Sequence, residues 1–205
     1  MGRNCATRCP SSTRRRWKSN RRAREGAGGS DAHRPRDVEG VARGIERLVE
    51  LAGAEEAYIA VAPDLDADRR LNRTSQPTPL ADRFAVRASI AYKGCWVRRT
   101  RTFAKDGSAA KVDAWFEGVV QSVEPGKPLA AQLAEKLKAL TRATLDWWRA
   151  EGCTGSYPLW VVGSSHAPTS MAPLGGQFLV LTVEVTINSA PWVGTAPLVV
   201  GQTKL

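Results

Sequence analysis

The stretch RFAVRASIAYKGCWVRRTRTFA, Arg83–Ala104, decides the fold. It consists of two runs, Arg83–Tyr92 and Cys95–Ala104, that are rich in aromatic and β-branched residues and flank the dipeptide Lys93-Gly94. Two strand-like runs separated by two residues, one of them glycine, are typical of a β-hairpin. The sequence therefore predicts an antiparallel hairpin at this point.

The segments around the hairpin alternate between helix-like and strand-like patterns. Apolar residues spaced three and four apart predict helices over 37–52, 111–123 and 129–148. Apolar runs bounded by turn residues predict strands at 57–62, 157–162, 177–188 and 197–201, and the proline-containing stretch 63–82 predicts a long connection. Helices inserted between antiparallel strand groups predict an α+β fold.

Charge divides the 205 residues into two parts. The chain has a formal charge of +10, and residues 1–36 hold 11 Lys and Arg against two acids. Their Arg, Ser, Gly and Pro content predicts a disordered basic arm, with a domain over 37–205. Three interpretations of the arm stay open: binding to nucleic-acid phosphates, targeting, and a solvated tail without function. Nucleic-acid binding is expected through residues 1–36 only.

The compartment follows from what the sequence lacks. No apolar run approaches the roughly 20 residues that a membrane helix needs, and no secretory signal pattern begins the chain. The four cysteines do not form a set with zinc-ligand spacing, so we expect reduced thiols in a cytoplasmic protein without membrane partners.

Glu184 is the one charged side chain between residues 152 and 203. It lies in the predicted strand 177–188, whose odd-numbered positions from 179 to 187 are all apolar. A carboxylate at such a position raises the free energy of the fold unless it is paired, protonated or bound to a metal. The other interpretation is the exposed polar face of an edge strand, and both remain open.

Tyr92–Phe103 resembles the Y-x-G-Y-x-S-D-x-T-R-T-F segment of the pita-bread metallopeptidase family, which includes methionine aminopeptidase, prolidase, Xaa-Pro aminopeptidase and creatinase. The Gly94 turn and the run Thr100–Phe103 are the specific part of the likeness. Other stretches are similar to family motifs in the family's order: Gly152–Gly155 to G-H-G-x-G, Leu181–Glu184 to x-T-x-E-P, and Val193–Val200 to G-x-R-x-E-D-x-V-L-V.

The resemblance covers about residues 37–205 and implies a curved antiparallel pita-bread sheet with flanking helices, creatinase- and aminopeptidase-like. The domain would be N-terminally truncated, because the basic arm stands in place of the earliest helix of the usual catalytic domain. The resemblance also implies a homodimer.

Family members bind two divalent metal ions through two aspartates, a histidine and two glutamates. By the resemblance, these ligand positions fall in chain order on Arg87, Arg98, Cys153, Glu184 and Ala196. Four of the five types are changed, and a guanidinium repels a metal ion. We therefore assign no metal, no other cofactor and no catalytic residue.

Further pocket positions come from the same motifs. Thr100, Arg101 and Thr102 belong to the hairpin motif, and Trp160 falls where the family has a second histidine. We expect Arg87 or Arg98 to occupy the space of the metal and to pair with Glu184.

The resulting hypothesis is an aminopeptidase- or creatinase-like domain that has lost most metal ligands and serves as a non-catalytic binding or regulatory homologue. Its partner would be an unknown protein or an acidic small ligand. Two alternatives stay open: an active metal-dependent Xaa-Pro-type aminopeptidase with a non-standard site, and a nucleic-acid-binding protein acting through its basic arm. Metal-free hydrolysis as in creatinase uses a histidine base at the position that is Cys153 here.

Overall fold

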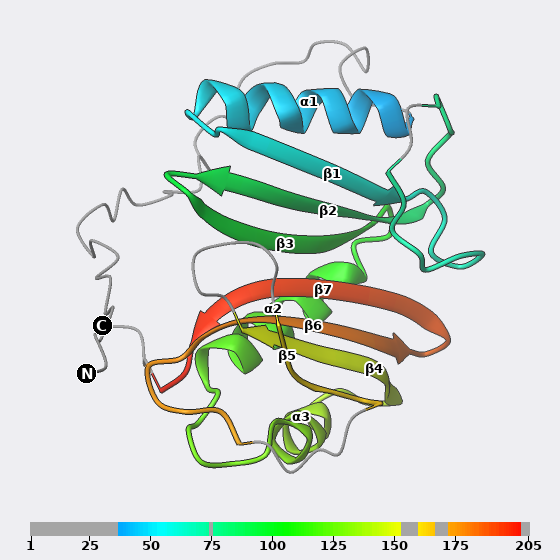
Figure 1. Cartoon of the computed structure of the whole chain (residues 1–205). Coiled ribbons are helices and arrows are strands. Elements are labelled where there is room, and N and C mark those ends of the chain that lie inside the picture. The colour runs from blue at the N-terminus through cyan, green and yellow to red at the C-terminus, as the bar shows by residue number, and fades with distance from the viewer. Residues whose placement is uncertain (1–36, 74–75, 153–159, 167–171, 202–205) are drawn as a thin grey trace, which may run out of the picture. The chain divides into compact units, whose positions relative to one another are not determined.

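The computed structural model describes residues 37–73, 76–152, 160–166 and 172–201, so the predicted basic arm lies outside the described residues. Within them, seven strands form one antiparallel sheet in the order β1-β2-β3-β7-β6-β4-β5, with three helices beside it (Figure 1). In chain order the elements are α1 (Val38–Leu51), β1 (Glu56–Ala62), β2 (Arg83–Tyr92), β3 (Cys95–Ala104), α2 (Ala109–Gln121), α3 (Leu129–Leu137), β4 (Ala143–Gly152), β5 (Trp160–Ser164), β6 (Phe178–Ile187) and β7 (Ala190–Val199).

The predicted hairpin is confirmed as β2–β3, with Tyr92 opposite Cys95. Its turn residues Lys93 and Gly94 both have positive φ, 51° and 73°, which is the backbone that a two-residue hairpin turn requires. The Glu55 carboxylate accepts hydrogen bonds from both turn amides, at 3.0 and 3.2 Å. A distant side chain thereby holds a turn that the local sequence already favours.

The first predicted helix is confirmed as α1. The side chain of Asp37 caps it by accepting a hydrogen bond from the amide of Gly40 at 2.7 Å. Its buried side packs on β1 and β2, where Val38, Ile59 and Val86 form part of one apolar cluster.

The predicted helix over 129–148 is wrong in its second half. Helix α3 ends at Leu137, and β4 begins at Ala143 after Arg142, whose φ is +53°. The apolar spacing continues past Leu137, but β4 pairs with β6 along its whole length. Tertiary pairing therefore overrides the local helical pattern.

The predicted strand over 197–201 is also displaced. Strand β7 begins at Ala190, directly after a tight turn at Asn188 and Ser189, and it pairs with β6 from Ile187 onward. Pro191 hid the first part of this strand, because proline usually ends one. The strand expected at 157–162 is β5, for which the structure describes 160–164.

All three helices pack on one face of the sheet. Apolar side chains of β6 and β7 form the main core with α2 and α3, and α1 covers β1 and β2 on the same side. The opposite, inner face carries the alternate residues of each strand. Part of the connection 63–82 folds over this inner face, where Leu65 packs with Ala62, Ala85 and Val193.

The sheet has a narrow seam between β3 and β7. Thr100 and Thr195 form its one ladder pair. Beside this pair, the Thr102 hydroxyl bonds to the backbone of β7 where a further ladder pair would otherwise stand. It donates to the carbonyl of Val193 at 2.8 Å and accepts from the Val193 amide at 3.0 Å. No helix in the described part of the chain has the length and apolar character to cross a membrane.

Candidate functional site

A single row of side chains crosses the inner face of the sheet. Arg87 on β2 lies opposite Thr100 on β3, which lies opposite Thr195 on β7. Thr195 lies opposite Thr182 on β6, and Thr182 lies opposite Arg149 on β4. Directly paired residues share a face of a sheet, so these five form one line of polar groups. We call it the arginine–threonine row.

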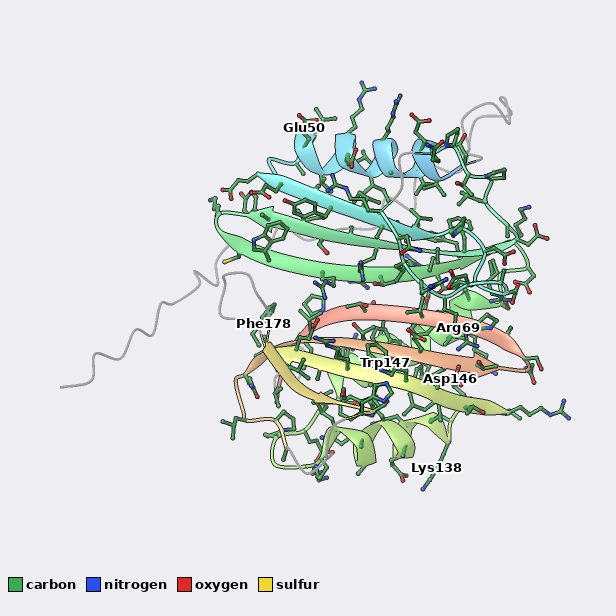
Figure 2. The ribbon with its side chains drawn as sticks, turned by 45° about the vertical axis from the view of Figure 1, so that its right-hand side comes forward. Glu50, Arg69, Lys138, Asp146, Trp147 and Phe178 are labelled. Carbon is green, nitrogen blue, oxygen red and sulfur yellow. The ribbon has the colours of Figure 1, made fainter. Side chains whose placement is uncertain are left out.

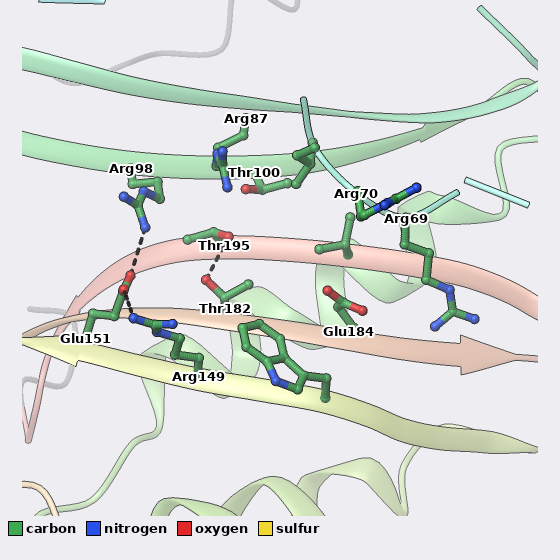
Figure 3. A pocket seen from close by; sticks show the side chains of 13 residues that line it. Arg69, Arg70, Arg87, Arg98, Thr100, Arg149, Glu151, Thr182, Glu184 and Thr195 are labelled. Atoms are coloured by element: carbon green, nitrogen blue, oxygen red, sulfur yellow. Dashed lines mark hydrogen bonds and ion pairs between the residues drawn. The ribbon is translucent and has the colours of Figure 1, made fainter. Parts of the chain in front are cut away.

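A cavity of about 360 Å³ lies over the arginine–threonine row (Figure 3). Its lining includes five arginines and two glutamates, and Arg69 and Arg70 are paired with Asp146 and Asp68 outside the lining, which leaves a formal excess of one positive charge. These charged residues are Arg69, Arg70, Arg87, Arg98, Arg149, Glu151 and Glu184. The pocket therefore favours anions over cations.

Glu151 joins two of these arginines. Its Oε2 accepts from Nη1 of Arg98 at 2.8 Å and its Oε1 lies 3.0 Å from Nη2 of Arg149, as the dashed lines in Figure 3 show. Glu151 is only 6% exposed. A carboxylate with one guanidinium on each oxygen is compensated despite its burial, and this triad links β3 to β4 across the seam.

Three buried polar atoms have no hydrogen-bond partner among the described residues. They are Nε of Arg98, Nε of Arg149 and Oγ1 of Thr100. All three side chains line the cavity, and Thr100 is only 4% exposed. Buried donors in proteins are almost always satisfied, so these atoms point to an acceptor in the pocket.

The other two threonines of the row are bonded to each other, with their Oγ1 atoms 3.1 Å apart. In such a pair one hydroxyl donates and the other accepts. The accepting hydroxyl keeps its own hydrogen, which extends the set of donors along the floor of the cavity.

Glu184 lies at the other end of the cavity, opposite Trp147. Burial raises the pKa of Glu184, the charge of Arg69 opposes that shift, and the charge of Asp146 adds to it. Of the two arginines expected to pair with Glu184, Arg98 does not, because it is bonded to Glu151.

Arg69 fastens the folded-over connection to the strands. Its Nη1 lies 2.5 Å from the Asp146 carboxylate of β4, and its Nη2 donates to the Thr186 hydroxyl of β6 at 2.9 Å. Figure 2 shows Arg69 and Asp146 close together at this side of the sheet. One wall of the cavity is therefore formed by residues 69–71 of the connection.

Three of the five positions assigned to former metal ligands meet at the cavity: Arg87, Arg98 and Glu184. Ala196 does not, because it pairs with Leu181 and is buried in the helix-facing core. A one-residue shift along a strand changes the face, and Thr195 occupies the inner face instead. Cys153 lies outside the described residues.

The remaining predicted pocket positions do not all lie at the cavity. Thr100 lines the cavity and Thr102 forms the seam, whereas Arg101 faces the helices and its Nε lies 3.1 Å from the Asp113 carboxylate of α2. Trp160 begins β5 opposite Gly152.

Arg149 and Glu151 were missed because both directly follow the helix predicted over 129–148. The signal that identifies them is the alternation Trp147, Arg149, Glu151, which puts all three on one face of a strand. Arg69 belongs to a charged run in a connection, and its sequence carries no sign of the contact with β4.

The donors of the pocket do not fit a pair of divalent metal ions. Such ions need several carboxylate or imidazole ligands, and the described residues contain no group of three or more His, Cys, Asp or Glu that is arranged to hold a metal. Of the two carboxylates here, Glu151 is held between two guanidiniums.

Solved structures share this architecture. Methionine aminopeptidase from Rickettsia prowazekii superposes with a TM-score of 0.55 at 8% identity, over 83% of this chain and 85% of that chain. Prolidase from Pyrococcus furiosus gives 0.57 at 13% identity, over 83% and 55%. The chain has the pita-bread fold. The predicted fold class is thereby confirmed, and identities this low show the fold alone.

Methionine aminopeptidase from Thermotoga maritima gives a TM-score of 0.53 at 10% identity, over 79% of this chain and 83% of that chain. The chain thus spans most of the length of these methionine aminopeptidases and about half the length of the prolidase. No protein-family model and no curated protein matches the sequence.

Proposed function

We propose that the domain over 37–205 is a non-catalytic binding domain whose inner-face pocket takes an acidic small ligand. The arginine–threonine row is the observation that carries the proposal. The row includes Arg87, and Arg98 and Glu184 line the same cavity. The resemblance assigns all three positions to metal ligands.

The physical basis is the chemistry of the guanidinium group. Arginine stays charged in proteins and presents several N–H donors in a plane, which suits carboxylate and phosphate oxygens. Hydrogen bonds between ionised partners are roughly twice as strong as those between neutral groups, and partial burial reduces screening by salt. An anion in this cavity would meet an excess of positive charge and donors that have no other acceptor.

Peptide hydrolysis places different demands on a site. It needs an activated water or nucleophile and a group that takes up a proton. The arginines that line the cavity stay protonated and Glu151 is held between two guanidiniums, which leaves Glu184 as the one lining carboxylate that could take up a proton. Binding therefore accounts for the lining better than an Xaa-Pro-type aminopeptidase with a non-standard site.

The test combines three measurements on the purified full chain: metal content, hydrolysis of a peptide library that includes Xaa-Pro substrates, and calorimetric titration with sulfate, phosphate and succinate. We expect no stoichiometric Mn, Co or Zn, no turnover, and saturable anion binding that weakens as salt rises. Stoichiometric metal with turnover, or the absence of binding to every anion, contradicts the proposal.

A further inference from the structure

We infer that the ligand is a phosphate monoester, with its phosphoryl group over the arginine–threonine row and a small organic group in the rest of the cavity. The inference rests on the proposed function, since it names the ligand class of the same pocket. The positions of the donors, the orphaned hydroxyl, the charge excess and the cavity volume carry it.

The donors lie on both sides of the threonines of the row. Arg87 and Arg149 end the row, four inter-strand steps or about 19 Å apart along the curved sheet. Figure 3 shows Arg87 and Arg98 on one side of the threonines and Arg149 on the other. A planar carboxylate is satisfied by one bidentate arginine, whereas a phosphoryl group offers three acceptor oxygens in different directions. The arrangement suits the phosphoryl group.

The buried hydroxyl of Thr100 is the second member of the row, next to Arg87, and Arg98 lies two residues before it on the same face of β3. The Oγ1 of Thr100 has no partner among the described residues, and neither has Nε of Arg98 or of Arg149. A phosphoryl oxygen above Thr100 would accept from this hydroxyl. Its other oxygens would then face the guanidiniums of Arg87 and Arg98 beside it.

Charge and size agree with an ester rather than the free ion. A phosphate monoester carries about −1.5 to −2 at pH 7, and the cavity keeps a formal excess of one positive charge when the aspartate partners of Arg69 and Arg70 are counted. The cavity of about 360 Å³ is within the range of small-molecule sites, about 300–1,000 Å³, and exceeds the space of one ion. Leu71, Trp147 and Val193 provide apolar lining for the organic group.

The test is calorimetric titration of the full chain at constant ionic strength with ethyl phosphate, inorganic phosphate and succinate. Succinate matches the charge of the ester but carries carboxylates. We expect ethyl phosphate to bind about tenfold or more tightly than succinate, and more tightly than inorganic phosphate. The affinity for ethyl phosphate should rise between pH 5 and 7, as the phosphoryl group loses its second proton near pH 6.

Two variants test the geometry. Thr100→Val should lower the affinity for ethyl phosphate about tenfold without loss of stability, because its hydroxyl has no partner to lose. Arg98→Gln should lower it further, whereas Arg99→Gln should not. Arg99 is the matched control, since it lies next in the same strand but faces α2, where it is paired with Glu117.

The outcomes separate the two proposals. Equal affinity for succinate and ethyl phosphate, or an unchanged affinity in Thr100→Val, overturns the phosphate monoester and leaves an anion-binding pocket. Equal affinity for inorganic phosphate and the ester overturns the organic part. If none of the three anions binds, the proposed function fails with the inference.

Discussion

Glu151 is the residue on which the charge balance of the pocket depends. It is buried and holds Arg98 and Arg149 at once, each through a different oxygen. Without it, two guanidiniums at the edge of the core would have no ionic partner among their present contacts. The same residue therefore contributes to stability and limits how strongly the pocket attracts an anion.

We predict that Glu151→Gln lowers the free energy of unfolding by about 3 kcal/mol and raises the affinity for anions. Urea unfolding and titration with succinate measure the two effects. Glu117→Gln is the control, because its pair with Arg99 is exposed and should be worth less than about 1 kcal/mol. A loss of stability without a gain in anion affinity would show that Glu151 does not oppose the ligand.

Glu184 should make stability depend on pH in the opposite sense to a paired carboxylate. Burial raises its pKa, so the folded protein binds the proton more tightly than the unfolded chain does. Stability is then lost as pH rises from the unfolded pKa, about 4.3, through the higher folded pKa. Glu184→Gln should remove this loss, so the variant gains stability over the parent between pH 4 and 8. Parallel profiles of unfolding free energy against pH would contradict the assignment.

At the scale of elements, the predictions that succeeded rest on local signals. The hairpin β2–β3 and helix α1 follow from a two-residue turn and from capping by Asp37, which act within a few residues. Strands β4 and β7 were missed or displaced because their partners lie elsewhere in the sheet. Leu145 continues a helical spacing and Pro191 resembles a strand breaker, yet pairing with β6 places both in strands.

The candidate site could likewise be predicted only where the sequence carries a local signal. Glu184 stands out because its neighbours in the sequence are uncharged, and the hairpin motif placed Arg98 and Thr100 on the inner face. Arg149 and Glu151 were missed because they directly follow the predicted helix 129–148, whose second half is strand β4. Ala196 was chosen by motif spacing, which cannot resolve a one-residue shift, and a shift of one residue exchanges the two faces of a strand.

Strand β7 depends on Gly194 for the place of Trp192. A Cβ at Gly194 would lie 2.0 Å from the indole, which is 2% exposed and donates from Nε1 to Asp113 at 3.0 Å. Gly194→Ala should therefore cost about 1–3 kcal/mol of unfolding free energy and shift the tryptophan emission. Gly118→Ala in α2 has open space and should instead stabilise by about 0.5–1 kcal/mol. Equal effects of the two substitutions would contradict the packing.

At the scale of the whole described domain, the sheet consists of two halves, β1–β2–β3 and β7–β6–β4–β5. One ladder pair and the Thr102 hydroxyl join them directly, and the pairs Arg98–Glu151 and Arg69–Asp146 join them through side chains. The pocket lies over this seam, with donors from both halves. A ligand that contacts donors of both halves would therefore strengthen the junction between them.

The seam can be tested with two threonines on the same face of β3. Thr102→Val removes a donor and an acceptor from the buried backbone of Val193 and should lower the free energy of unfolding by about 1–3 kcal/mol. Thr100→Val, the control, loses no hydrogen bond and should be nearly neutral. Hydrogen exchange should become faster at the amides of β3 and β7 in Thr102→Val, and saturating ethyl phosphate should restore part of that protection. Equal stabilities of the two variants would contradict the role of Thr102 in the seam. Hydrogen exchange that the ester leaves unchanged would show that a ligand in the pocket does not stabilise the junction of the two halves.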